Sequence, residues 1–253
     1  MTALQDFSQE LSDMGFVLGA DFLHFKHACG IEVRYIPLES EYEVKKETVF
    51  QVIVHEDIWL NHKNAVINRL TALTGNTKRI HGRECSVIRI DSPTARNFLD
   101  LYHTGGFVNA YFKYGLFFRN ELVAVGLFGK CKTFKPENEQ AFKSAELTRY
   151  ASKTGIRIAG GMDKIMSLFC REYRVYHIMT YADKEWTDGK SYVKLGFDKI
   201  GDTPPLQFRV NKQTGQRIYA ENKASLKTDD WVHKSNLGNM KLVKKIPGIN
   251  WVL

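Results

Sequence analysis

The sequence predicts an α/β (α+β) protein, with a small N-terminal α/β module followed by a mixed, mostly antiparallel sheet flanked by helices. Two observations predict it. Segments with apolar residues at helical spacing alternate with short β-branched runs. Two apolar runs also meet at Arg119-Asn120, a pair typical of a β-hairpin turn. We divide the chain into the module at residues 1–90, a second domain at 91–210 and a basic C-terminal extension at 211–253.

The N-terminal module is predicted to contain two helices, a hairpin and a buried strand. Apolar residues at helical spacing over 4–14 indicate an amphipathic helix. Residues 22–38 alternate on both sides of a Cys-Gly turn, which favours a hairpin. The β-branched run at 49–59 predicts a buried strand. Residues 60–74 are predicted to form a helix that ends at Gly75.

The second domain is predicted to begin with a helix at 91–103, where an Asp or Ser cap precedes a proline in the first turn. The elements expected after it are a hairpin at 114–130, a strand at 144–152, a glycine-led helix at 160–173, a strand at 175–183, a short helix at 190–197 and a last strand at 207–211. No internal repeat is evident, so the chain is not a repeat array.

Charge is unevenly distributed along the chain. The net charge is +8, but the first 60 residues hold four Lys/Arg against eleven Asp/Glu, which leaves +15 on the rest. The segment 211–253 carries eight Lys/Arg against three Asp/Glu, with Trp231 and Trp251 among them. A basic surface with aromatic residues indicates DNA as a partner, and a solvated lysine-rich face is the alternative.

The remaining composition predicts a cytoplasmic protein. No apolar run approaches the roughly 18 residues of a membrane span, and the first residues lack the basic-then-apolar order of a secretory signal. The four cysteines show no C-x-x-C pairing, so reduced, packed thiols are expected. We expect no membrane partner; the oligomeric state cannot be predicted.

Residues 157–162, Arg-Ile-Ala-Gly-Gly-Met, resemble the Q/R-x-x-G-x-G/A motif of the GNAT acyltransferase family, and the element order over 91–210 is similar to the GNAT layout. Glycines let the backbone approach a pyrophosphate, and a helix N-terminus binds its charge. The resemblance implies acetyl-CoA or another acyl donor, held by Arg157, Gly160, Gly161 and Met162. Met162 stands where Gly or Ala is usual and would narrow the cradle. A glycine helix start without a ligand is the alternative.

Residues 192–197 have the Tyr-x-x-x-Gly-Phe pattern with which GNAT proteins commonly close the fold. The resemblance implies that Tyr192 protonates the leaving thiolate. The alternative is that Tyr192 packs on the sheet while Gly196 caps the helix.

Residues 144–152 contain Glu146-Leu-x-Arg149, which is similar to a strand of the Mom family, GNAT relatives that modify adenine in DNA. This likeness implies that Arg149 orients an anionic or amide group and that Asp183 accepts a proton from a base amine. An Arg149–Asp183 ion pair of purely structural value is the alternative. Lys184 and Trp186 follow Asp183 and are predicted to bind substrate, with Trp186 stacking on a flipped base.

Seven segments over 50–210, from "VHEDIWLNHKNAVINRL" through "GLFFRNELVAVGLFGK" to "TPPLQFRV", resemble phage mobile (homing) endonucleases in this order. In those proteins a Vsr-like or EDxHD-type nuclease module precedes a GNAT-like domain. The resemblance implies a phage or mobile-element origin, hence the host cell cytoplasm, and DNA as target. The nuclease module of those proteins has a helix after the position of Glu32, but here only a short acidic stretch separates Glu32 from residue 49.

A metal site is not predicted. A divalent metal enters only with the nuclease alternative, through His55, Glu56 and Asp57, which cannot all converge if they share one strand. His24 lies opposite His27 and Cys29 on an alternating strand, so a packed hairpin is expected there instead of zinc.

Three functions follow. The favoured one is a phage-type, DNA-directed GNAT-like transferase that places an acyl-type group on a nucleobase. The alternatives are a Vsr/EDxHD-like mobile DNA endonuclease and a catalytically decayed DNA-binding protein.

Overall fold

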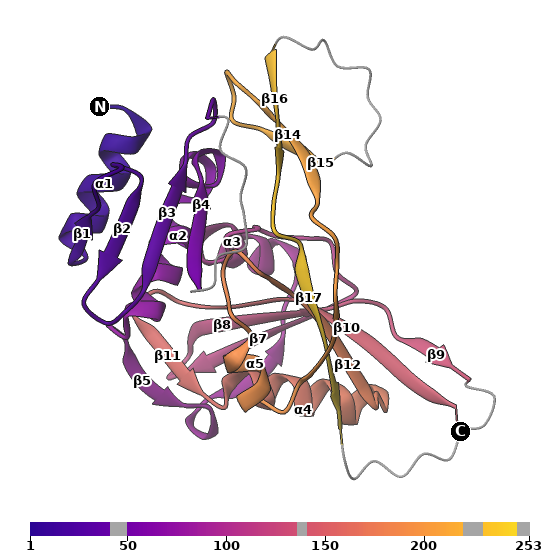
Figure 1. The fold of residues 1–253 in the computed structure, drawn as a ribbon. Coiled ribbons are helices and arrows are strands. Elements are labelled where there is room, and N and C mark those ends of the chain that lie inside the picture. The colour runs from indigo at the N-terminus through magenta and orange to yellow at the C-terminus, as the bar shows by residue number, and fades with distance from the viewer. Residues whose placement is uncertain (41–49, 136–140, 220–229, 247–253) are drawn as a thin grey trace.

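The computed structural model describes residues 1–40, 50–135, 141–219 and 230–246. It confirms the predicted α/β (α+β) class, because mostly antiparallel sheets are combined with flanking helices (Figure 1). Trp251 lies outside the described residues. No helix in the described ranges is long and apolar enough to cross a membrane.

The N-terminal unit is a four-stranded sheet with a helix before it and a helix after it. Its elements are α1 (Ala3–Asp13), β1 (Phe16–Leu18), β2 (His24–His27), β3 (Glu32–Ile36), β4 (Gln51–His55) and α2 (Glu56–Thr74), with strand order β1-β2-β3-β4. The predicted hairpin is β2–β3, whereas β3 and β4 run parallel. Gly75 ends α2 with a φ of 82°, as the sequence predicts.

The strand predicted over 49–59 is too long. It ends at His55, and Glu56 and Asp57 form the first turn of α2. An apolar run of this length does not by itself distinguish strand from helix, and acidic side chains are favoured at a helix N-terminus by the helix dipole. The three residues considered as metal ligands therefore do not share one strand.

The second unit is built on a large sheet. Its elements are β6 (Ser86–Arg89), α3 (Ser92–Tyr102), β7 (Phe112–Phe118), β8 (Glu121–Phe128), β9 (Lys132–Phe134), β10 (Phe142–Ser152), α4 (Gly161–Tyr173), β12 (His177–Asp183), α5 (Lys190–Lys194), β13 (Asp198–Asp202) and β17 (Asn239–Lys245). The strand order is β13-β17-β12-β10-β8-β7-β6, and β9 pairs with β10. Only β10 and β12 are parallel neighbours in this described sheet.

The predicted succession of helix, hairpin, strand, glycine-led helix, strand and short helix is present. Asp91 caps α3 through a hydrogen bond from the Thr94 N–H, and a proline lies in its first turn. The β7–β8 turn has positive φ at Arg119 and Asn120, 50° and 67°, as a primed hairpin turn requires. The order of elements that the GNAT resemblance implies is therefore found.

The end of the chain differs from the prediction. Gln207–Asn211, expected as the last strand of the domain, is β14 in a separate sheet with β15 (Arg217–Tyr219) and β16 (Trp231–Ser235). The strand after α5 is β13, and β17 lies between β12 and β13. The described residues within 211–253 thus belong to two sheets and are not simply a basic extension. The buried residues Met240 and Leu242 alternate with less buried neighbours, and the lysine-rich composition of the segment obscured this period.

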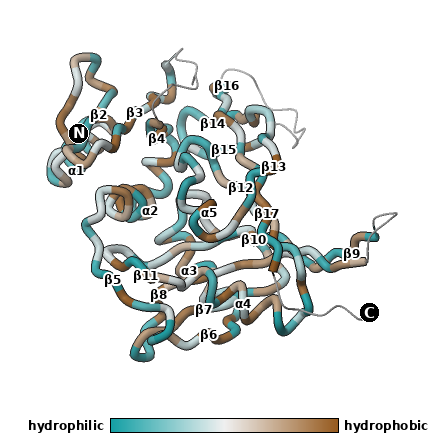
Figure 2. The backbone as a smooth tube through the Cα atoms, turned by 60° about the horizontal axis from the view of Figure 1, so that its bottom comes forward, coloured by the Kyte–Doolittle hydropathy of each residue, from teal (hydrophilic) through white to brown (hydrophobic). Residues whose placement is uncertain are grey.

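The second unit also begins before residue 91. β5 (Lys78–His81) pairs in parallel with β11 (Ile156–Ala159), and β6 pairs with β7. In Figures 1 and 2, α2 lies between the N-terminal strands and the large sheet. It contributes Trp59, Val66 and Leu70 to the N-terminal hydrophobic core and contacts α3 on its other side.

Candidate active site

The parallel pair at the centre of the large sheet separates partway along. β10 and β12 are paired from Ser144 opposite His177 only as far as Glu146 opposite Met179. Just beyond this point, β10 shifts its register against β8 between Leu147 and Arg149, which is a β-bulge or similar irregularity. Bulges are common beside active sites, and ligands bind at the carboxyl ends of parallel strands in open sheets.

Arg149 lies directly after this register shift. Its guanidinium donates to the carbonyl oxygens of Thr148 (2.8 Å), Gly106 (3.1 Å) and Gly105 (3.4 Å). Burial lowers its pKa from the ordinary arginine value, while Glu146 nearby opposes this. No ion pair between Arg149 and Asp183 is formed in the described structure, so the structural pair considered above is absent.

His103, at the end of α3, faces the same arginine. The Gly105 N–H donates to Nδ1 of His103 at 3.0 Å. A Cβ on Gly105 would lie 3.3 Å from Nη2 of Arg149 and 3.5 Å from Nδ1 of His103, so the absence of a side chain permits this close packing. Burial, followed by Arg149 and Arg69, lowers the pKa of His103 to about 3. The ring is therefore neutral near pH 7, with Nδ1 as acceptor and Nε2 assigned the proton from this hydrogen bond.

The half-buried, neutral His103 predicts a pH-dependent stability. Its pKa is about 3 in the folded state and about 6.5 when unfolded, so its contribution is complete above the unfolded pKa and is lost as the pH falls. His103→Asn keeps an acceptor for the Gly105 N–H. As the pH falls from 7 to 5, the free energy of unfolding of the wild type should decrease by up to about 2 kcal/mol more than that of the variant. Urea denaturation at the two pH values measures this difference. The same pH dependence in both proteins would contradict this.

Arg69 brings the N-terminal unit into the site. Its neighbour Asn68 donates through Nδ2 to the carbonyl oxygens of Tyr102 (3.1 Å) and Ser152 (3.0 Å), which ties α2 to the ends of α3 and β10. Arg69 itself donates to the Trp186 carbonyl oxygen at 3.3 Å. It also lies within electrostatic reach of Tyr192: burial raises the pKa of that phenol, and Arg69 opposes the rise. Sequence analysis did not identify Arg69 or His103.

Asp183 lies at the carboxyl end of β12. Its Oδ1 accepts the Glu185 N–H at 2.9 Å. Burial and then the Glu185 carboxylate raise the pKa of Asp183, and the Glu185 N–H, Arg217 and Lys184 oppose them, which leaves it at about 7. A carboxyl group that titrates near neutral pH is suited to accept a proton during catalysis.

The two residues predicted to bind substrate after Asp183 are placed differently. Lys184 is half-buried and is one of the cations near Asp183. Trp186 is only 8% exposed and packs in the hydrophobic core of the N-terminal unit. Its ring is therefore not presented for stacking in this conformation, and its predicted contact with a base stays a prediction.

The glycine-led start of α4 is open on one side. Gly160 has a φ of 72°, and a Cβ built there would meet nothing within 4 Å, whereas a Cβ on Gly161 would lie 2.9 Å from the Tyr150 hydroxyl. Met162 packs against the core of the large sheet, so it is not free to project over Gly160. Asp163 in the first turn is paired with Lys244, Oδ1 to Nζ 2.6 Å. The loop thus leaves room for an anionic group at Gly160.

Arg157 precedes this loop on β11. The parallel register places it opposite Arg79 of β5, and both side chains are exposed. β11 and a turn separate β10 from the glycines. Two arginines directly opposite one another repel unless an anion is near.

The residues considered for a nuclease metal are engaged in other contacts. His55 Nε2 lies 3.1 Å from Glu185 Oε1, in the interior. Asp57 accepts two hydrogen bonds from Arg217, at 2.7 and 2.9 Å, and is 3% exposed at its side chain. Glu56 accepts the Leu38 N–H. The His55 and Asp57 contacts join the N-terminal unit to the β12–α5 loop and to β15.

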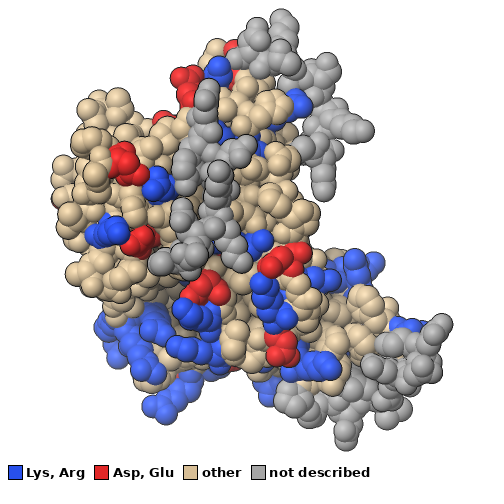
Figure 3. All heavy atoms as spheres, in the orientation of Figure 1, with Lys and Arg blue, Asp and Glu red and all other residues tan. Residues whose placement is uncertain are grey.

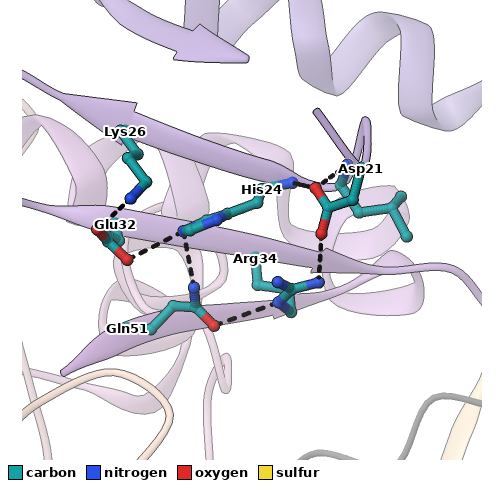
Figure 4. A network of polar contacts seen from close by, with 7 residues as sticks. Asp21, His24, Lys26, Glu32, Arg34 and Gln51 are labelled. Atoms are coloured by element: carbon teal, nitrogen blue, oxygen red, sulfur yellow. Dashed lines mark hydrogen bonds and ion pairs between the residues drawn. The ribbon is translucent and has the colours of Figure 1, made fainter. Parts of the chain in front are cut away.

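The polar face of the N-terminal sheet is a connected network (Figure 4). Glu32 lies 2.9 Å from Lys26 and 3.0 Å from His24, whose Nε2 also contacts Gln51 at 2.9 Å. Beyond these, Arg34 pairs with Asp21 and also contacts Gln51. Lys26 and His24 both hold the pKa of Glu32 below its ordinary value. In the ranges that the structure describes, no group of three or more His, Cys, Asp or Glu residues is arranged to hold a metal ion.

The hairpin pair His27 and Cys29 contact each other, Nδ1 to Sγ 2.9 Å, at the β2–β3 turn. His24 lies away from them in the network of Figure 4. The packed hairpin expected from the sequence is therefore found.

No family model and no curated protein matches this chain. Solved structures are similar in part. A GNAT family acetyltransferase from Elizabethkingia anophelis with acetyl-CoA bound is 11% identical, over 64% of this chain and 99% of that one, with a TM-score of 0.33. The IAA acetyltransferase from Bacillus cereus ATCC 14579 is 10% identical over the same shares, with a TM-score of 0.34. Arabidopsis thaliana Naa50, in complex with the bisubstrate analogue CoA-Ac-MVNAL, is 12% identical over the same shares, with a TM-score of 0.37.

Proposed function

We propose that the protein is a GNAT-like acyltransferase that moves an acyl group from a CoA thioester to an amine of a nucleobase in DNA. The observation that carries the proposal is the separation of β10 and β12 after three paired residues, bordered by Asp183 on one strand and Arg149 on the other. The raised pKa of Asp183, about 7, supports a proton acceptor there. Tyr192 near Arg69 supports a proton donor.

The two groups suit the two proton transfers of this reaction. A bond forms between the amine nitrogen and the acyl carbon, and the carbon–sulfur bond breaks. Asp183 takes the proton that the amine loses. Tyr192 gives its hydroxyl proton to the departing thiolate. CoA supplies the activated thioester when bound, and Gly160, Gly161, Met162 and Arg157 are the residues that would hold its pyrophosphate.

Acyl-CoA binding is tested by a matched pair of glycine variants. Gly160 and Gly155 share a φ of 72° and open space at the Cβ position, but only Gly160 caps α4. Gly160→Glu and Gly155→Glu therefore introduce the same charge with similar backbone strain. We expect acetyl-CoA, or another acyl-CoA if acetyl is not the group carried, to raise the Tm of the wild type and of Gly155→Glu but not of Gly160→Glu. No rise in the wild type with any acyl-CoA would count against the donor.

DNA is supported as the acceptor by the distribution of charge. Figure 3 shows Lys and Arg side chains gathered over the region of β5 and β11, and fewer over the N-terminal unit. Arg79 and Arg157 lie opposite each other there, and Lys78 and Arg83 nearby are exposed. Repelling exposed cations are stabilised by phosphates, whose binding releases counterions.

A double variant tests this surface. Lys78→Ala/Arg79→Ala, which leaves the predicted pyrophosphate ligand Arg157 in place, should weaken DNA binding about uniformly across sequences and reduce the slope of log Kobs against log salt by about 2. The exposed pair Lys132→Ala/Lys135→Ala on and beside β9 removes the same charge elsewhere, so it serves as a control. Equal losses in both double variants would show that net charge, and not this surface, governs binding. Binding is measured by fluorescence anisotropy at several salt concentrations.

The endonuclease alternative receives no support from the described contacts. His55, Asp57 and Glu32 each have protein partners, and none of them belongs to a metal-ligand group. DNA binding without catalysis is the outcome that remains if no acyl group is transferred.

A further inference from the structure

Two arginines beside the separation of β10 and β12 have no carboxylate partner. Arg69 and Arg149 are absent from the ion pairs formed within the described ranges. Both side chains are half-buried, and the charges of both lower the pKa of the same imidazole, His103. By contrast, the buried Arg217 has a bidentate carboxylate, Asp57. The site therefore combines two half-buried cations, neither of which forms an ion pair in the described ranges, and the Glu146 carboxylate near Arg149 is not hydrogen-bonded to it.

The two guanidinium groups differ in how many hydrogen bonds they donate. Arg149 is held by three carbonyl oxygens, which fixes its plane against Gly105 and Gly106. Arg69 makes one described hydrogen bond, at 3.3 Å to Trp186 O, out of the five that a guanidinium can donate. Withdrawing a cation from water without an opposite charge is unfavourable, so a buried arginine normally has an anionic partner.

The neighbouring groups suit an anion and not a cation. His103 is kept neutral, and with Nδ1 accepting from Gly105 its Nε2 is left as a donor. Tyr192 adds a hydroxyl within electrostatic reach of Arg69. Guanidinium groups match the oxygens of phosphate in pairs of parallel hydrogen bonds. A phosphate is also the anion that accompanies every base of a nucleic acid.

We infer that Arg69 and Arg149, with His103, bind one phosphate of the acceptor nucleotide and so position its base between β10 and β12. This inference rests on the proposed function for the identity of the ligand, but the phosphate site itself does not require acyl transfer. The same chemistry would accept a free phosphate or a nucleoside monophosphate. The cationic pair is distinct from the exposed Arg79–Arg157 pair and from the start of α4.

Phosphate-dependent stabilisation, without acyl-CoA or DNA, is the test. We expect inorganic phosphate to raise the Tm of the wild type above the value in chloride of equal ionic strength. Arg69→Met should abolish the difference, while Arg171→Met, which removes an exposed arginine at the end of α4, should retain it. Because Arg69 has one weak described contact, Arg69→Met should also be at least as stable as the wild type in chloride. No phosphate-specific rise in the wild type would overturn the site.

Calorimetry and competition distinguish the phosphate of a nucleotide from free phosphate. A nucleoside monophosphate should bind at least tenfold more tightly than its nucleoside by calorimetry, and Arg69→Lys, which keeps the charge but loses the planar fork, should reduce this preference. A single-stranded oligonucleotide should compete with inorganic phosphate for the site. If inorganic phosphate binds but the oligonucleotide does not displace it, the nucleic-acid assignment is overturned and a site for free phosphate remains. Loss of stability in chloride for Arg69→Met, with phosphate binding retained, would make Arg69 a structural residue.

Discussion

Asp183→Asn is expected to lower kcat/KM for acyl transfer by about 10²–10³-fold, the contribution typical of a positioned general base. The carboxyl group lies at the end of β12, and burial raises its pKa to about 7. Asparagine keeps the oxygen that accepts the Glu185 N–H at 2.9 Å, so the turn should be preserved while the base is lost. The wild-type pH profile should rise with a pKa near 7, and the variant should lack that limb.

The free energy of unfolding of Asp183→Asn should also depend on pH differently from that of the wild type. A carboxyl group whose folded pKa is raised binds a proton in the folded state that the unfolded state has lost, so stability falls as the pH rises from about 4 to about 7. Asp183→Asn should therefore gain stability relative to the wild type as the pH increases through this window. Asp198→Asn, at an exposed position on β13, is the control for activity. Equal activity of the wild type and Asp183→Asn across pH would remove Asp183 from the mechanism.

Asp57→Asn is expected to lower the free energy of unfolding by about 3–5 kcal/mol, because it leaves the Arg217 guanidinium withdrawn from water beside a neutral amide. The pair is bidentate, with distances of 2.7 and 2.9 Å, and the side chains are 3% and 13% exposed. Arg217 also stacks on Phe208, with its central carbon 3.7 Å from the ring centroid. The pair joins α2 to the small sheet of β14, β15 and β16.

Two further variants test whether the loss of stability in Asp57→Asn comes from the unpaired charge of Arg217. Glu121→Gln breaks the exposed pair with Lys153 and should change stability far less than Asp57→Asn. Asp57→Leu/Arg217→Met removes both charges and should be much closer to the wild type than Asp57→Asn. Urea unfolding at pH 7 measures all three. A loss below about 1 kcal/mol in Asp57→Asn would show that water or another group compensates Arg217.

The sequence predicts those elements that local physics determines. α1, α3 and the β7–β8 hairpin follow from spacing, capping and a turn pair that tolerates positive φ. The pairing of β5 with β11, and the insertion of β17 between β12 and β13, join segments far apart in the chain. No local pattern specifies such partners, and in β17 the alternating lysines concealed an inward apolar face.

The candidate site divides in the same way. Asp183 and Tyr192 were predicted from the resemblance of their segments to Mom and GNAT proteins, and the structure places them at the end of β12 and in α5. Arg69 and His103 enter the site only because α2 and the end of α3 pack across the second unit, which depends on tertiary structure. Trp186 was predicted to bind substrate, but it packs in the hydrophobic core of the N-terminal unit. No pattern within its own segment indicates that contact.

Mass spectrometry of nucleosides tests acyl transfer to DNA most directly. DNA incubated with the protein and acetyl-CoA, and in parallel with other acyl-CoA thioesters, is digested to nucleosides and compared with DNA treated with Asp183→Asn. We predict a nucleoside with an exocyclic amine whose mass increases by one acyl group in the wild-type reaction and is unchanged in the variant reaction. Unmodified nucleosides throughout, from a folded protein that binds both DNA and acyl-CoA, would contradict the proposed function.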